Sequence, residues 1–147
     1  MKKYKYTFSL FLFLFSFNSF AELTLKEYAD KHFDFDFDKM SKQELIYICL
    51  RCNALYTFHE MMGFANDKDK EFRKESGLLI LESYKIIYPD KDFDFHWDLF
   101  NGNAEPHFQM YRNKSIKNFE ETKKTYSDFH ADDFAFCDMV FDPESGL

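Results

Sequence analysis

The segment from residue 41 to residue 62 limits the possible folds of this chain more than any other feature. Ser41 and Glu44 match the Ser/Thr-x-x-Glu capping box, which satisfies free backbone amides at the start of a helix. Gly63 is a typical residue just after a helix. Between these signals, residues recur at the spacing of one buried helix face, namely Leu45, Ile48, Cys52, Leu55, His59 and Met62. We expect a helix here, with this stripe at the centre of the folded domain.

Signals of the same kind predict further helices on both sides. Thr24 and Glu27 form another capping box, Pro89 follows a long periodic segment, and the Asn-Gly-Asn turn at residues 101–103 together with Pro106 marks the start of a later helix. The expected helices span residues 24–30, 41–62, 67–88, about 106–126 and 131–141. Runs of β-branched residues are missing, and the chain has only 4 Gly and 3 Pro. The expected fold class is therefore all-α, a compact bundle of about four to five helices.

Two similar segments, residues 33–38 and 92–97, interrupt the helical pattern with alternating Phe and Asp. Alternation is the period of a strand, but Asp is disfavoured in strands, and each segment directly precedes an expected helix. We expect both segments to be extended connectors whose Phe rings pack on the bundle.

Residues 1–21 have the features of a secretory signal peptide that is removed by cleavage. Three lysines stand among the first five residues, an apolar block covers residues 8–17, and small residues follow up to Ala21. The block is shorter than the roughly 18 to 20 apolar residues that span a bilayer, so we expect cleavage after Ala21 and no membrane span afterwards. The predicted mature protein is a single helical domain, residues 22–147, in the periplasm or outside the cell.

The net charge of the chain excludes some classes of partner. The whole chain has a formal charge of −7, and loss of the leader with its three lysines changes this to −10. Such an acidic domain does not suit nucleic acid or anionic membrane surfaces, which recruit Lys and Arg. A protein or small-ligand partner is the remaining expectation, and the sequence contains no cofactor-binding motif.

Three cysteines in an oxidising compartment usually form one disulfide and leave one thiol. Cys49 and Cys52 have the spacing of a thioredoxin-type motif, but they lie inside a predicted helix, whereas a reactive first cysteine needs an exposed helix start. Cys52 lies centrally on the apolar stripe, and Cys137 lies on the apolar side of the last expected helix. We therefore favour a structural Cys52–Cys137 disulfide with Cys49 as a buried free thiol, and a Cys49–Cys137 pairing stays open.

Metal sites and catalytic motifs are not expected. The acidic runs lack the later Gly and Glu of a calcium-binding loop, and the five histidines form no zinc-binding pattern. The favoured function is a non-catalytic secreted domain that binds a protein or small ligand. The alternative is a thiol-redox protein that uses Cys49 and Cys52, or a metal-dependent enzyme that uses the region of His96, Asp98 and His107.

Overall fold

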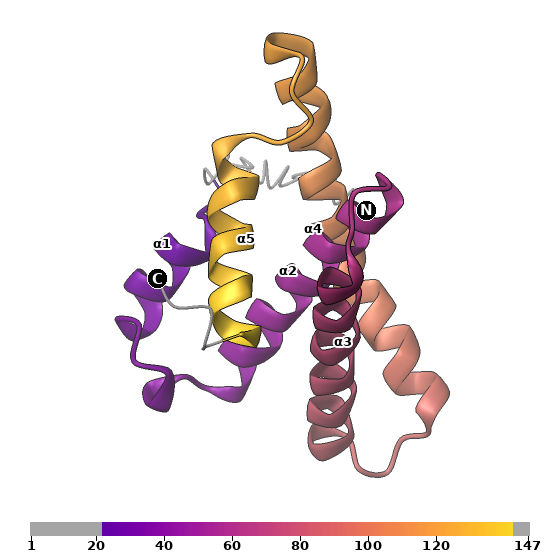
Figure 1. Ribbon diagram of the computed structural model, residues 1–147. Coiled ribbons are helices and arrows are strands. Elements are labelled where there is room, and N and C mark those ends of the chain that lie inside the picture. Colours follow the sequence, from indigo (N-terminus) through magenta and orange to yellow (C-terminus); the bar gives the residue numbers. More distant parts are fainter. Residues whose placement is uncertain (1–21, 143–147) are drawn as a thin grey trace, which may run out of the picture.

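The computed structural model describes residues 22–142, so the predicted signal peptide, residues 1–21, lies outside the described part of the chain. The described residues form helices without any strand, which confirms the all-α fold class (Figure 1). The helices are α1 (Leu25–Phe33), a short 3-10 helix η1 (Phe37–Lys39), α2 (Lys42–Met61), α3 (Asp67–Ile87), α4 (Phe93–Thr122) and α5 (Asp128–Phe141). Within this part of the chain, no helix is both long and apolar enough to cross a membrane.

Capping boxes start α1 and α2 where the sequence predicts them. Thr24 Oγ1 accepts a hydrogen bond from the Glu27 amide at 3.2 Å, and the Glu27 carboxylate accepts one from the Thr24 amide at 2.8 Å. Ser41 and Glu44 exchange the equivalent pair at 3.2 and 2.7 Å. Both α1 and α5 are somewhat longer than predicted.

Helix α2 is the central element of the bundle, and it packs against α3, α4 and α5 (Figure 1). Ile48, Cys52 and Leu55 of the predicted stripe are completely buried. Nearly all residues from 46 to 58 are buried as well, including the charged Arg51. The predicted stripe is therefore correct at its centre but too narrow, because neighbouring helices cover α2 on several sides.

A disulfide between Cys52 of α2 and Cys137 of α5 joins positions that are 85 residues apart in the sequence. This is the pairing that the apolar helix faces favour, and Cys49 is the free, buried cysteine. The disulfide belongs to the core cluster that joins α1, α2 and α5 to the start of α3, through Phe72, and to the second half of α4. Another core cluster joins α2 to α3 and to the first half of α4.

The start of α4 corrects the prediction from the sequence. The helix begins directly after Asp92, whose Oδ1 accepts a hydrogen bond from the Phe95 amide at 2.9 Å, and it continues through residues 101–103 and Pro106. These helix-breaking residues are exposed, whereas Phe100 is buried in the core cluster of α2, α3 and α4. Tertiary packing of this segment therefore outweighs its local preference for a turn.

Neither Phe-Asp segment is the extended connector that the sequence predicts. Residues 93–97 form the first turn of α4, because Asp92 acts as its N-cap. In the other segment, Phe33 ends α1, and Asp34 and Phe35 adopt the left-handed backbone conformation, with φ of 51° and 55°. Asp favours helix caps and tolerates left-handed turns, and this preference outweighs the alternating pattern in both places.

Candidate functional site

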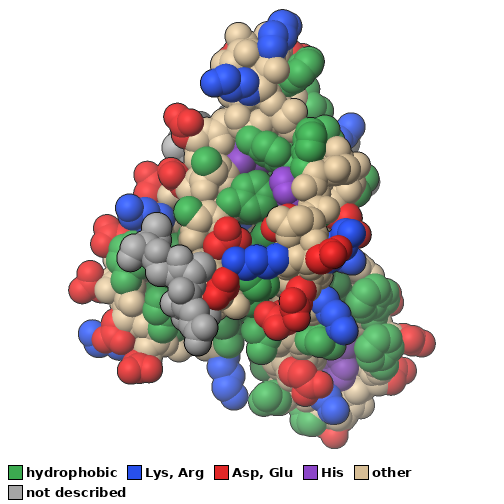
Figure 2. Space-filling model, viewed as in Figure 1, with side chains coloured by type: hydrophobic (Ala, Val, Ile, Leu, Met, Phe, Trp, Pro, Cys, Tyr) green, Lys and Arg blue, Asp and Glu red, His purple; other side chains and the backbone are tan. Residues whose placement is uncertain are grey.

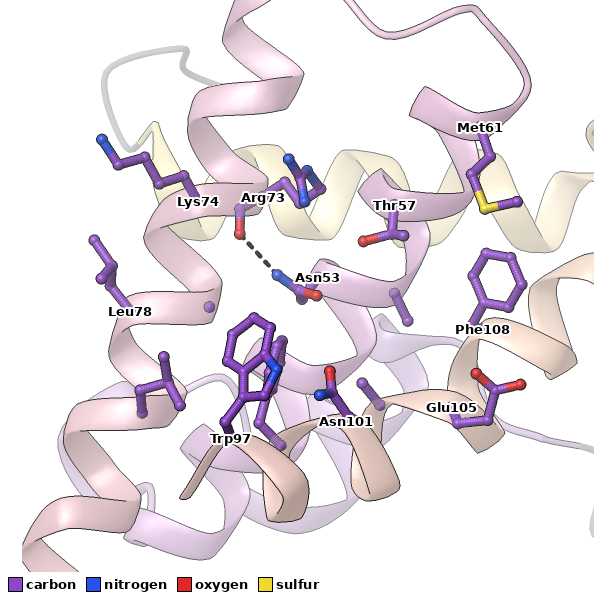
Figure 3. Close-up of a pocket in the computed structure, with 15 residues that line it drawn as sticks. Asn53, Thr57, Met61, Arg73, Lys74, Leu78, Trp97, Asn101, Glu105 and Phe108 are labelled. Atoms are coloured by element: carbon purple, nitrogen blue, oxygen red, sulfur yellow. Dashed lines mark hydrogen bonds between the residues drawn. The ribbon is translucent and has the colours of Figure 1, made fainter. Parts of the chain in front are cut away.

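A cleft with a volume of about 690 Å³ lies between α2, α3 and α4 (Figure 3). Its apolar lining consists of Ala54, Met61, Gly77, Leu78, Leu81, Trp97, Phe100, Ala104 and Phe108. Its polar lining consists of Asn53, Thr57, Arg73, Lys74, Asn101 and Glu105. All three helices therefore contribute side chains to the same space.

Small residues on the three helices keep this space open. Gly77 of α3 faces α2, and a Cβ atom at this position would lie 3.4 Å from Asn53 Nδ2 and 4.0 Å from the Phe100 ring. Ala54 of α2 and Ala104 of α4 line the same cleft. Larger side chains at these positions would fill part of it.

The walls carry large apolar side chains that remain in contact with solvent. Met61 is 71% exposed, Leu78 52% and Trp97 44%. The Trp97 ring packs against the Phe100 ring, with 5.4 Å between their centroids. Exposed apolar side chains that gather around a hollow are typical of a binding site.

Asn53 is the most buried polar residue of the lining, with 7% of its surface exposed. Its Nδ2 donates to the Arg73 backbone carbonyl at 2.7 Å and to the Ser76 hydroxyl at 3.1 Å. These contacts fix the orientation of the side-chain amide, and the Thr57 and Asn101 side chains extend toward the same part of the cleft (Figure 3).

Charged residues stand on opposite sides of the cleft. On the α3 side, Arg73 forms an ion pair with Glu60, with 2.7 Å between Nε and Oε2, and Lys74 is exposed. On the α4 side, Glu105 is exposed and accepts a hydrogen bond from Gln109 Nε2 at 2.6 Å.

Two further apolar features adjoin the cleft. A hollow of about 490 Å³ shares Met61 and Phe108 with it and continues along α4 to Phe119. Hydrophobic side chains also gather on the surface over the end of α3 and the start of α4, at the lower right of Figure 2. In this patch the exposed Phe93 ring stacks on Trp97, with 6.1 Å between the ring centroids. Trp97 thus belongs to both the cleft and this patch.

The structure separates the two cysteines of the redox alternative. Cys52 is joined to Cys137, and Cys49 is 1% exposed. Burial raises the pKa of the Cys49 thiol to about 12, which disfavours the thiolate that attacks disulfides. This environment gives the redox alternative no support.

The residues of the metal alternative do not converge either. His96 is buried, and its Nε2 lies 3.0 Å from the Tyr88 backbone carbonyl, whereas Asp98 is exposed. His107 packs edge-on against Tyr47, and burial, aided by the Arg51 charge, lowers its pKa to about 4. Among residues 22–142, no group of three or more His, Cys, Asp or Glu side chains is placed to hold a metal ion.

Sequence reasoning missed a buried charged cluster that joins four elements. The Arg51 guanidinium of α2 forms an ion pair and a hydrogen bond with the Asp133 carboxylate of α5. Tyr111 of α4 also donates to Asp133, because burial raises the pKa of Tyr111 and keeps its hydroxyl protonated. Helix α1 joins through the amide of its first residue, Leu25, which donates to Asp133 at 2.6 Å, and the chain before it joins through the Leu23 carbonyl, which accepts from Arg51 at 2.6 Å. The available signals in the sequence were Arg51 within the apolar segment of α2 and Asp133 within the apolar segment of α5.

The cleft itself was also missed from the sequence. Asn53 and Thr57 are four residues apart on α2, so they lie on the same helix face, and this spacing was the available signal. In the sequence, Trp97 was of interest only because it stands between His96 and Asp98, two residues of the metal alternative. The remaining lining residues come from helices whose contacts a sequence pattern does not reveal.

The fold and the site define an all-α domain with a ligand-sized cleft between three helices. Comparisons of the chain with protein-family models, with curated proteins and with solved structures find no match. The function is therefore inferred from the cleft.

Proposed function

We propose that the protein is a non-catalytic binding domain that holds an amphipathic ligand in the cleft between α2, α3 and α4. The observation that carries this proposal is the combination of apolar walls with the polar side chains of Asn53, Thr57 and Asn101, which converge on one part of the cleft (Figure 3). Small-molecule sites have typical volumes of about 300 to 1,000 Å³, mainly apolar walls and a few oriented polar groups. The cleft, at about 690 Å³, matches this description.

The chemistry of the polar groups supports binding over catalysis. They are two side-chain amides, a hydroxyl, a carboxylate and two basic groups, from Asn53, Asn101, Thr57, Glu105, Arg73 and Lys74. These groups orient a ligand by hydrogen bonds. Nucleophilic catalysis needs a nucleophile next to a general base, usually with His or Cys, and the cleft lining contains neither residue type.

Export of the protein is part of the same proposal. The Cys52–Cys137 disulfide fits an oxidising compartment such as the periplasm or the extracellular space. We expect removal of residues 1–21 on export, so N-terminal sequencing of the secreted or periplasmic protein should begin at Glu22. A protein that keeps Met1 would contradict this part.

Binding in the cleft can be followed with a reporter that the chain already contains. Trp97 is the single tryptophan, and it lines the cleft. Titration with phenylbutanol, a neutral molecule with an apolar ring and a hydroxyl, should shift the Trp97 fluorescence in a saturable way. Calorimetry of the same titration checks the affinity.

A pair of matched variants locates the site. Leu78 and Ile86 both lie on α3, and they are 52% and 62% exposed, but only Leu78 lines the cleft. Leu78→Asp should abolish the saturable response by placing a charge on the apolar wall, and Ile86→Asp should leave it unchanged. If the wild type gives no saturable response, or if both variants respond equally, the cleft is not the binding site.

A further inference from the structure

We propose that the ligand of this cleft is an organic cation, with a primary ammonium group on an apolar body. This inference rests on the proposed function and specifies the chemical class of the ligand. It follows from the hydrogen-bonding character of Asn53 and its neighbours, the sign of the free charge in the lining, and the aromatic side chains of the α4 wall.

The floor of the cleft presents an acceptor that is fixed in place. The Asn53 amide uses its two hydrogens on the Arg73 carbonyl and the Ser76 hydroxyl, at 2.7 and 3.1 Å, so the group left for the cleft is Oδ1. Within the described part of the chain, no donor bonds to this oxygen, and it is not a buried atom, so it is open to the solvent of the cleft. An amide oxygen in such a place gains from a ligand that donates a hydrogen bond.

Further acceptors surround the same position. The side chains of Thr57 and Asn101 extend toward it from α2 and α4, and the Glu105 carboxylate lies on the α4 side of the cleft, nearer to Phe108 (Figure 3). A primary ammonium has three N–H donors and no acceptor, so it matches a cleft that offers amide and hydroxyl oxygens at one place and a carboxylate on its α4 side. The contact with Glu105 would be charge-assisted, and such hydrogen bonds are stronger than neutral ones.

The basic residues of the cleft lining do not cancel the preference of the cleft for a cation. Arg73 is already neutralised by Glu60, at 2.7 Å. The Lys74 amino group points away from the interior of the cleft (Figure 3). Glu105 is therefore the free charge that faces the ligand, and the formal charge of −7 on the whole chain attracts cations over a longer range.

The aromatic wall adds a second attraction for a cation. Trp97 and Phe100 line the cleft from α4, with 5.4 Å between their ring centroids. The face of an aromatic ring attracts an organic cation, and tryptophan does so most strongly. The apolar body of the ligand would lie against Leu78 and Leu81 on the opposite wall.

Three probes of nearly the same shape test this assignment: phenylbutylamine, phenylbutanol and phenylbutyrate. Calorimetry and Trp97 fluorescence should show that the amine binds roughly tenfold more tightly than the alcohol, as expected for one charge-assisted hydrogen bond, and that the carboxylate binds most weakly. The preference for the amine should decrease as salt is added, because salt screens an exposed carboxylate.

Substitution of the proposed counter-charge gives a sharper test. Glu105→Gln should lower the affinity for the amine by roughly tenfold and leave the affinity for the alcohol unchanged. Glu121→Gln is the matched control, since it makes the same charge change at an exposed position of α4 that lies outside the cleft lining. This control should bind both probes as the wild type does.

The possible outcomes separate this inference from the proposed function. Equal affinities for amine and alcohol, tighter binding of the carboxylate, or an unchanged amine affinity in Glu105→Gln would each overturn the ammonium assignment while ligand binding in the cleft stands. If none of the three probes binds, both the assignment and the proposed function are wrong.

Discussion

At the scale of single residues, the most unusual feature is a fully buried ion pair. Arg51 and Asp133 are 1% and 0% exposed, and the removal of two charges from water is costly. Here the cost is offset because Tyr111 and the backbone of Leu23 and Leu25 satisfy the remaining hydrogen-bonding groups. The pair therefore positions α1, α2, α4 and α5 relative to one another. Its contribution to the stability of the fold depends on both partners being present.

We therefore expect a conservative substitution at Asp133 to cause a large loss of stability. Asp133→Asn should lower the free energy of unfolding by about 3 kcal/mol or more, because it leaves the Arg51 charge buried without a counter-charge. Asp132→Asn, at the exposed neighbouring position, should change it by less than about 0.5 kcal/mol. Urea unfolding followed by circular dichroism measures both values. Equal values for the two variants would show that the buried charge does not contribute to stability.

At the scale of elements, α4 shows how packing overrides local preference. It carries Gly102 and Pro106 in its interior, and each disfavours a helix at that position. The helix persists because Phe100 and Met110 on either side of them are buried in two different core clusters. It therefore links the two halves of the core through its least helical segment.

The glycine in this segment offers a gain in stability. Gly102→Ala should raise the free energy of unfolding by about 0.5 to 1 kcal/mol, because alanine favours the helix and nothing lies within 4 Å of the added Cβ atom. Gly63→Ala has equally open space, but its φ of 78° is left-handed, so this variant should lose about 1 to 2 kcal/mol. Thermal and urea unfolding should show stability changes of opposite sign for the two variants. A loss of stability in Gly102→Ala would mean that α4 needs this flexible point.

At the scale of the whole molecule, the disulfide is the longest covalent constraint among the described residues. It joins Cys52 in the central helix to Cys137 near the end of the described chain, 85 residues later. The cross-link connects the last helix to the centre of the bundle, and α5 in turn packs on α1. On chain-entropy grounds, a closed loop of this length stabilises a fold by about 4 to 5 kcal/mol.

The three cysteines provide a matched test of this contribution. Cys52→Ser and Cys137→Ser should lower the melting temperature by similar amounts, and the double variant should be little worse than either, because each change removes the same cross-link. Cys49→Ala removes a buried thiol but no cross-link, so its effect should be smaller. If Cys49→Ala were the most damaging single change, the disulfide would not be the main constraint.

The sequence alone determined the features whose signals are local. The capping boxes at Thr24 and Ser41 were readable because a side chain and a backbone amide three residues apart satisfy each other. The all-α class followed from helical spacing. The apolar helix faces on which Cys52 and Cys137 lie favoured their pairing but left a Cys49–Cys137 pairing open, and the structure decided between the two. Each of these signals depends on residues within a few helical turns.

Tertiary structure decided the continuation of α4 through residues 101–106, the buried ion pair and the cleft. The start of α4 has a local signal in the N-cap Asp92, but its continuation depends on the burial of Phe100 and Met110 against other helices, which outweighs the turn signal at residues 101–103. Arg51 meets Asp133 across 82 residues, and Asn53 meets Ser76 across 23. The energy of such contacts comes from groups that are close only after the helices have packed, so no local pattern in the sequence encodes them.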